Sequence, residues 1–234
     1  MGRASRRRAE RRNAPQRPRP AGTGAPQVHG RYVIRPAAPG DDPGAVRALL
    51  EPVDFMDPAM PEEIIDRMRT GWRLPPQYGT ATLLLAEEHA TGEIVGLAHA
   101  MPPVQWLMET GLGRPLCLRL ARALVELEAV SVAGSARGQG LGHRLVDHLV
   151  RSYTRQGYEA VLGGIHTHKP YLAPYYEAGG FRVLPPGAPL DLQLSVGRLR
   201  YPADASMRHL VRALMPGVSY GAGVLSGLLA GKAT

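Results

Sequence analysis

Residues 124–153 read LVELEAVSVAGSARGQGLGHRLVDHLVRSY, and this stretch decides the fold. Side chains alternate over 124–132 as they do in a β-strand, which predicts Glu126, Glu128, Val130 and Val132 on one face. Apolar residues then recur at helical spacing over 141–153. The stretch therefore predicts a strand and an amphipathic helix joined by a short glycine-rich loop.

The loop reads Arg137-Gly138-Gln139-Gly140-Leu141-Gly142. Backbone amides of such a turn converge without side-chain obstruction, and the dipole of the following helix adds positive potential, so the turn can bind an anion. A dinucleotide fingerprint would need glycine where His143 stands, and a Walker loop would need a lysine. The loop predicts a site for a phosphate-bearing ligand, although a plain strand-to-helix turn could use the same glycines.

Patterns on both sides of this stretch predict further strands and helices in an α/β domain. Residues 116–123 are ambiguous between helix and strand, and 160–165 predict a short buried strand. The other predicted elements are a strand at 32–34, helices at 46–50 and 62–69, a hairpin of 82–87 with 93–100, a weak helix at 171–178, a closing hairpin of 181–184 with 190–199, and a helix at 207–215.

The charge of the chain is concentrated at its start. The formal net charge is +8, of which residues 1–30 contribute +7 through eight arginines and one glutamate, leaving +1 for 31–234. Residues 1–30 have few large apolar side chains, so we expect a disordered arm. We expect nucleic acid to be bound only through this arm, if at all. The predicted domain is 31–202, and 203–234 are predicted to form a C-terminal helix and a flexible tail.

The location of the protein is predicted from its single cysteine and its hydropathy. Cys117 cannot form an intramolecular disulfide or a cysteine-based zinc cluster, which fits a reducing compartment. The sequence has no apolar run long enough to span a membrane and no secretory signal after the arginines. We expect a cytoplasmic protein without a membrane partner or a bound metal.

Three segments in register resemble one family. The first is Arg-x-x-Gly-x-Gly after a strand, with its arginine at 137. The second is Tyr176-Glu177-Ala178-Gly179-Gly180-Phe181, and the third is the start at 32–49. Together they resemble the GCN5-related N-acetyltransferases. The resemblance implies a mixed, mostly antiparallel central sheet of about seven strands, flanked by helices, with two central strands that splay apart.

The resemblance also implies a ligand and residues that bind it. The ligand is acetyl-CoA, whose pantetheine arm would pair with the strand at Val130, Ser131 and Val132. Its pyrophosphate would be held by the amides of Arg137, Gly138, Gln139, Gly140, Leu141 and Gly142, and any side chain at Gly140 or Gly142 would crowd it. Tyr176 stands where the family places the proton donor near the sulfur, with Tyr175 as its competitor.

The implied reaction is direct attack of an amine on the thioester in a ternary complex, which requires a base and a proton donor. Glu126 and Glu128 are about 7 Å apart along the strand and can raise each other's pKa, so either is a candidate base. They could instead pair with Arg119 or Arg122. The alternative bases are His99, His166 and His168.

Two features leave the acceptor undefined. Many relatives have asparagine before the second helix of the site, whereas this chain has His168-Lys169-Pro170, and Lys169 could approach a phosphate instead. Apolar and acidic residues after the first helix could line a pocket for a cationic amine. The set is Asp54, Phe55, Met56, Asp57, Met60, Glu62, Glu63, Trp72, Tyr78 and Trp106.

The acceptor is predicted to be a small-molecule or protein amine. The alternative functions are a non-catalytic acyl-CoA sensor and a nucleic-acid-associated protein. Met207, Leu210, Val211, Leu214 and Met215 form the apolar stripe of the predicted C-terminal helix, which would pack on the domain or on the second subunit of a homodimer.

Overall fold

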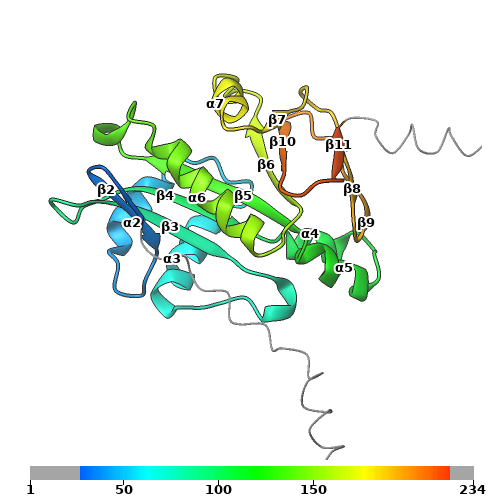
Figure 1. Cartoon of the computed structure of the whole chain (residues 1–234), viewed down its shortest axis with the longest axis horizontal. Coiled ribbons are helices and arrows are strands. Elements are labelled where there is room, and N and C mark those ends of the chain that lie inside the picture. Colours follow the sequence, from blue (N-terminus) through cyan, green and yellow to red (C-terminus); the bar gives the residue numbers. More distant parts are fainter. Residues whose placement is uncertain (1–26, 222–234) are drawn as a thin grey trace, which may run out of the picture.

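The computed structural model describes residues 27–221, and an eight-stranded sheet runs through this part of the chain (Figure 1). Neighbouring strands are antiparallel except for β5 and β6, which are parallel. This confirms the predicted mixed, mostly antiparallel sheet. In sheet order the strands are β1 (Gln27–His29), β2 (Tyr32–Pro36), β3 (Thr82–Glu88), β4 (Ile94–Met101), β5 (Leu124–Val132), β6 (Ala160–His166), β10 (Met207–Ala213) and β7 (Arg182–Val183).

Helices cover both faces of this sheet (Figure 1). On one face, α6 (Leu141–Arg155) and α7 (Leu172–Ala178) share a buried cluster with side chains of β2 to β6. On the other face, α2 (Pro43–Leu50) and α3 (Met60–Thr70) share a second cluster with side chains of β3 to β5. The two clusters bury both faces of the middle strands, which explains their apolar sequences.

Local chemistry sets the ends of the helices on the second face. Asp42 precedes α2, and its side chain accepts a 2.8 Å hydrogen bond from the amide of Gly44, which caps the helix start. Gly71 ends α3 with φ of +63°, a left-handed conformation that glycine adopts without a steric penalty. The predicted helix at 62–69 is confirmed. The observed helix begins two residues earlier and ends one residue later.

A second lobe lies at the far end of the sheet (Figure 1). Two short helices join β4 to β5, and they pack against a three-stranded sheet through a separate buried cluster. The helices are α4 (Val104–Glu109) and α5 (Arg114–Ala121), and the strands, in sheet order, are β11 (Ser219–Gly221), β8 (Leu190–Leu194) and β9 (Gly197–Tyr201). The ambiguous segment 116–123 is therefore mostly helical, because its apolar side chains pack on one side against this sheet.

Strands β5 and β6 stop pairing with each other about halfway along their length. Their pairing joins Leu124–Leu127 to Ala160–Gly163, whereas β5 continues to Val132 and β6 to His166. Beyond this point β5 pairs only with β4 on its other side, from Ala129 to Val132. This is the splay of two central strands that the family resemblance implies, and it gives β5 a backbone edge facing β6.

A β-bulge lies at the point where the splay begins. His99 pairs with Ala129 and Ala100 pairs with Leu127, so Glu128 is an extra residue in β5. Leu127 packs on the α6 side, Ala129 on the α2 and α3 side, and the valines at 130 and 132 again on the α6 side. The prediction of one face for Glu126, Glu128, Val130 and Val132 is therefore wrong, because strict alternation ignores the extra residue.

The predicted helix at 207–215 is also wrong. Met207–Ala213 form β10, which pairs with β6 along seven residues and with β7 at Leu210 and Val211. Leu210 and Val211 lie in buried clusters on opposite faces of the sheet, and two adjacent apolar residues fit a helix equally well by spacing. The pairing of β10 with two neighbouring strands decides in favour of the strand. Residues 203–221 therefore belong to the folded part.

Two other boundaries also differ from the prediction. Residues 27–29 of the predicted arm form β1 and pair with β2, while residues 1–26 lie outside the described part of the chain. Strand 181–184 does not form a hairpin with 190–199: β7 pairs with β10, and the hairpin is β8 with β9. Residues 222–234 of the predicted tail lie outside the described part. Between 27 and 221, no helix is long and apolar enough to cross a membrane.

The position of β10 inside the sheet, between β6 and β7, can be tested by shortening one of its buried side chains. Leu210 is 1% exposed within the α6-side cluster, so we expect Leu210→Ala to lower the free energy of unfolding by about 2–5 kcal/mol. Leu214→Ala, at a partly buried site just beyond the strand, serves as the control and should lower the free energy of unfolding by a smaller amount. Urea denaturation measures both variants, and equal losses would contradict the burial of β10 between β6 and β7.

Candidate active site

The glycine loop presents backbone amides at the start of α6. Gly138 and Gly140 have φ of +74° and +72°, which a residue with a side chain adopts only with strain. Gly140 is the N-cap and provides no side-chain cap, and the first hydrogen bond of the helix runs from the Arg144 amide to its carbonyl at 3.1 Å. The amides ahead of Arg144 therefore lack intrahelical partners, as an anion site requires.

Two side chains of the loop fix it to the sheet. The amide oxygen of Gln139 accepts a 2.9 Å hydrogen bond from the hydroxyl of buried Tyr32 on β2, and its nitrogen donates to the Ser135 carbonyl at 3.4 Å. Arg137 donates through Nε to the Val132 carbonyl at 3.0 Å. These contacts give Gln139 and Arg137 a positioning role in the loop, which has no signal in the sequence because it depends on tertiary contacts.

Gly142 has a different role from the two glycines before it. A Cβ at Gly138 or Gly140 would have no atom within 4 Å, whereas one at Gly142 would lie 2.6 Å from the Tyr175 hydroxyl oxygen. The Tyr175 ring stacks on His143 at 4.2 Å, and His143 Nε2 donates to the Tyr175 carbonyl at 2.9 Å. Gly142 is thus required for close packing of α7 against α6.

Tyr175 and Tyr176 differ in their surroundings. The Tyr175 hydroxyl is buried and has no hydrogen-bond partner among the described residues. Tyr176 is partly buried, and its ring meets Phe181 edge-on at 5.7 Å, beside the α6-side cluster. Burial raises the pKa of Tyr176 to about 12, so its phenol keeps the proton throughout the neutral range. It can therefore donate a proton.

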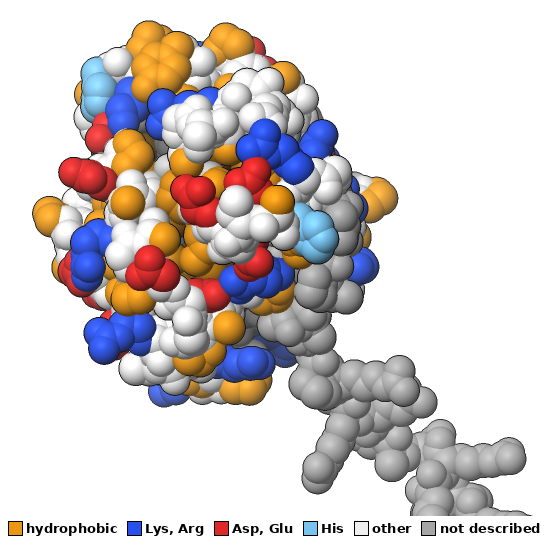
Figure 2. Space-filling view, turned by 90° about the vertical axis from the view of Figure 1, so that its left-hand side faces the viewer, with side chains coloured by type: hydrophobic (Ala, Val, Ile, Leu, Met, Phe, Trp, Pro, Cys, Tyr) orange, Lys and Arg blue, Asp and Glu red, His pale blue; other side chains and the backbone are white. Residues whose placement is uncertain are grey.

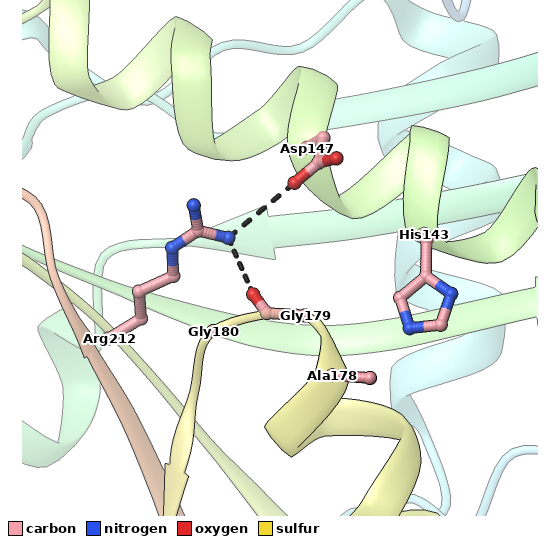
Figure 3. Close-up of a pocket in the computed structure, with 6 residues that line it drawn as sticks. All are labelled: His143, Asp147, Ala178, Gly179, Gly180 and Arg212. Atoms are coloured by element: carbon pink, nitrogen blue, oxygen red, sulfur yellow. Dashed lines mark hydrogen bonds and ion pairs between the residues drawn. The ribbon is translucent and has the colours of Figure 1, made fainter.

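A pocket of about 460 Å³ lies between α6 and the end of α7 (Figure 3). Arg212 of β10 reaches across it, donating to the Gly179 carbonyl at 2.6 Å and lying 3.5 Å from the Asp147 carboxylate. His143 lines the same pocket one turn ahead of Asp147. Because His143 follows the glycine loop directly, the pocket continues from the loop along α6.

Glu126 and Glu128 form a coupled carboxyl pair beside the bulge. Burial raises the pKa of Glu126, and a 2.8 Å hydrogen bond from the Tyr201 hydroxyl opposes this rise. Burial, followed by the negative charge of Glu126, raises the pKa of Glu128 to about 8, while Arg67 of α3 opposes the rise. The charge of Glu126 thus raises the pKa of Glu128, as predicted, whereas the rise in the pKa of Glu126 comes from burial. The neighbouring polar groups are Tyr201 and Arg67.

The alternative bases lie in less favourable positions. His99 on β4 is 3% exposed, its Nδ1 has no partner among the described residues, and burial together with the charge of Arg67 lowers its pKa to about 3. His166 donates to the Asp54 carbonyl at 3.1 Å, and His168 lies 2.9 Å from the Asp54 carboxylate. The two carboxylates are therefore the stronger candidates.

Asp54 joins the loop after α2 to the loop after β6. Its carboxylate lies 2.8 Å from Lys169 Nζ, so Lys169 is engaged in an ion pair. Other acids of the expected acceptor pocket are likewise engaged: Glu62 pairs with Arg47, Glu63 pairs with Arg67, and Asp57 caps the Ala59 amide. Of the expected apolar set, Phe55 and Met60 pack in the α2 and α3 cluster, while Met56 and Trp72 are exposed.

Figure 2 looks onto the side of the molecule where β2 and α2 lie. Acidic side chains surround hydrophobic surface at the centre of this face, and basic side chains lie mainly toward its edge. The face therefore combines apolar surface with acidic and basic side chains.

The comparisons with known proteins identify the family. The model of the acetyltransferase (GNAT) family matches residues 50–181, which is more than half of the chain. The chain belongs to the GNAT family of acetyltransferases, and the family prediction from sequence is confirmed. No curated protein matches the sequence significantly.

Solved structures of low sequence identity share the fold. A GNAT-family structure from Desulfovibrio desulfuricans has a TM-score of 0.52 at 16% identity and covers 79% of this chain and 99% of its own. YncA from Salmonella typhimurium, solved with its cofactor acetyl-CoA, has a TM-score of 0.53 at 18% identity, covering 80% and 96%. A GCN5-related N-acetyltransferase from Kribbella flavida has a TM-score of 0.50 at 19% identity, covering 78% and 98%.

The packing role of Gly142 predicts coupling between two variants. We expect Gly142→Ala to lower the free energy of unfolding by about 1–3 kcal/mol, because the new Cβ meets the Tyr175 hydroxyl. Tyr175→Phe removes that oxygen, so the double variant should recover most of the loss. Urea denaturation of the four proteins gives the coupling energy, and simply additive effects would contradict the contact.

The raised pKa of Glu128 predicts a pH-dependent gain in stability for Glu128→Gln. Because the folded pKa of about 8 exceeds the unfolded value of 4.5, the folded state loses stability as the pH rises between them. We expect the free energy of unfolding of the variant to exceed that of wild type by on the order of 2–4 kcal/mol at pH 9. This difference should vanish near pH 4. Exposed Glu93→Gln is the control, and an equal gain at both pH values would contradict this account.

Proposed function

We propose that the protein transfers the acetyl group of acetyl-CoA to a primary amine by direct attack in a ternary complex. The observation that carries this proposal is the end of β5–β6 pairing at Leu127 and Gly163, with the carboxyl pair beside it and the uncapped glycine loop after β5. The free edge of β5 suits the amide-bearing arm of an acyl-CoA, and the loop suits its pyrophosphate.

The residues present fit acetyl-CoA as co-substrate. Val130 and Val132 would pair their backbone with the pantetheine arm, with Ser131 between them. The amides from Arg137 to Gly142 would hold the pyrophosphate, and the pocket at His143 and Arg212 lies farther along α6, where the nucleotide end would extend. YncA, whose fold is similar, contains acetyl-CoA in its structure, which supports this choice of co-substrate.

The chemistry of transfer needs two proton movements. As the amine nitrogen bonds to the thioester carbonyl carbon and the carbon–sulfur bond breaks, the carboxyl pair takes a proton from the nitrogen. Tyr176 gives its proton to the departing thiolate sulfur.

The acceptor is a small-molecule or protein amine. A survey of amines for acetyl-CoA-dependent thiol release tests the proposal. Acetyl-CoA binding without release for any amine would favour a non-catalytic sensor. If acetyl-CoA is not bound at all, the proposed function is wrong.

The role of Tyr176 as proton donor is tested by Tyr176→Phe. We expect kcat to fall by about 10²–10⁴-fold, with acetyl-CoA affinity retained, because only the departing thiolate needs this proton. The control is Tyr171→Phe, since Tyr171 is 68% exposed just ahead of the same helix. Thiol-release kinetics and calorimetric binding measure the two effects, and wild-type turnover in Tyr176→Phe would remove Tyr176 from the mechanism.

A further inference from the structure

The connection between β4 and β5 is longer than its topology requires. Two antiparallel neighbours can be joined by a two-residue turn. Here residues 102–123 intervene and form α4 and α5, which pack against the three-stranded sheet of the second lobe. Such an insertion needs a physical reason, and its contacts lead back to the carboxyl pair.

Trp106 of α4 makes the first of these contacts. Its ring stacks on that of Tyr201 at the end of β9, with 3.9 Å between centroids and 25° between planes. His209 of β10 meets the Tyr201 ring edge-on at 5.5 Å, and its Nε2 donates to the Pro202 carbonyl at 2.9 Å. Tyr201 is therefore held in one orientation by two rings from different elements.

The Tyr201 hydroxyl makes the second contact, donating to Glu126 Oε2 at 2.8 Å. A hydrogen bond donated to a carboxylate is stronger and more directional than one between neutral groups, and it stabilises the ionised form. Its effect on Glu126 depends on Tyr201 being kept in place by the lobe.

We propose that Tyr201 is a positioning residue that keeps the single negative charge of the carboxyl pair on Glu126 and leaves the shared proton on Glu128. Glu126 is then the base that takes the proton from the acceptor amine. This inference rests on the proposed function for its catalytic meaning, whereas the distribution of charge within the pair can be measured without turnover.

The charged groups around the pair support this assignment. Arg67 of α3 is the cation on the Glu128 side, but it donates to Glu63 at 2.6 Å and to the Met101 sulfur, so its charge is shared. His99 of β4 is neutral in the working range, and His209 of β10 contacts the Tyr201 ring and donates to a carbonyl. The Tyr201 hydroxyl thus makes the direct hydrogen bond to the pair.

The pair loses its two protons in separate steps because two close carboxylates in a buried site do not both ionise easily. Burial and the charge of Glu126 hold the pKa of Glu128 near 8. Removing the hydroxyl of Tyr201 should raise the pKa of the first ionisation, which belongs to Glu126. The pKa of the second ionisation, which belongs to Glu128, should change little. The acid limb of the pH dependence of kcat/KM, which reports the first ionisation of the pair, should therefore move to higher pH.

The test is Tyr201→Phe in the full chain, with carboxyl titration followed by ¹³C NMR after selective labelling of glutamate. Glu126→Gln and Glu128→Gln assign the two signals. We expect the lower pKa of the pair to rise by about one unit, the shift that corresponds to loss of one charge-assisted hydrogen bond. Tyr220→Phe is the matched control, because Tyr220 packs in the same lobe from β11.

Two further measurements separate positioning from general damage. The acid limb of kcat/KM should shift by the same amount as the NMR titration. Trp106→Phe keeps a ring for stacking, so the lower pKa of the pair should stay at its wild-type value. In Trp106→Ala the lower pKa should rise part of the way to its value in Tyr201→Phe. Each of these results supports the proposal.

An unchanged lower pKa in Tyr201→Phe would overturn the proposal, as would the same shift in Tyr220→Phe. These failures are distinct from failure of the proposed function. If acetyl-CoA neither binds nor turns over, the titration of the pair still decides the role of Tyr201.

Discussion

The parting of β5 from β6 after Leu127 and Gly163 is the constraint on which the site depends. A sheet strand normally pairs on both edges, and the last part of β5 keeps only β4 as a neighbour. The splay leaves backbone groups free at the centre of the molecule, where the two helical layers shield them from competing strands. The glycine loop follows the unpaired end of β5 in the chain. A free strand edge and the unpartnered amides at the start of α6 therefore lie in one continuous segment.

The bulge at Glu128 and the second lobe adapt this frame for chemistry. The extra residue turns Glu128 and Ala129 toward the α2 and α3 side, so that Glu128 faces Arg67 as well as Glu126. The lobe brings Tyr201 to Glu126 from 75 residues farther along the chain. Burial raises the pKa of both carboxyl groups, whereas a hydroxyl donor held in place favours the ionised form of Glu126. The insertion between β4 and β5 thereby influences the reactive centre.

Local patterns in the sequence were sufficient to predict the helix after the glycine loop, the β3–β4 hairpin and the carboxyl pair. They failed where tertiary pairing decides the outcome. The apolar residues of 207–215 fit a helix by spacing, and only the position of 207–213 between β6 and β7 makes that segment a strand. The bulge has no sequence signal in a strictly alternating strand, and Tyr201 reaches Glu126 through packing of the lobe. Gly142 was predicted to be essential for ligand approach, but its close neighbour is Tyr175.

The free edge of β5 and the glycine loop are together proposed to bind one acyl-CoA. Hydrogen–deuterium exchange of the full chain with and without acetyl-CoA tests this binding, because it reports on the backbone amides proposed to contact the ligand. We expect increased protection of residues 129–132 and 137–143 on addition of acetyl-CoA. Protection confined to the second lobe, or no change in these two segments at saturating acetyl-CoA, would contradict it.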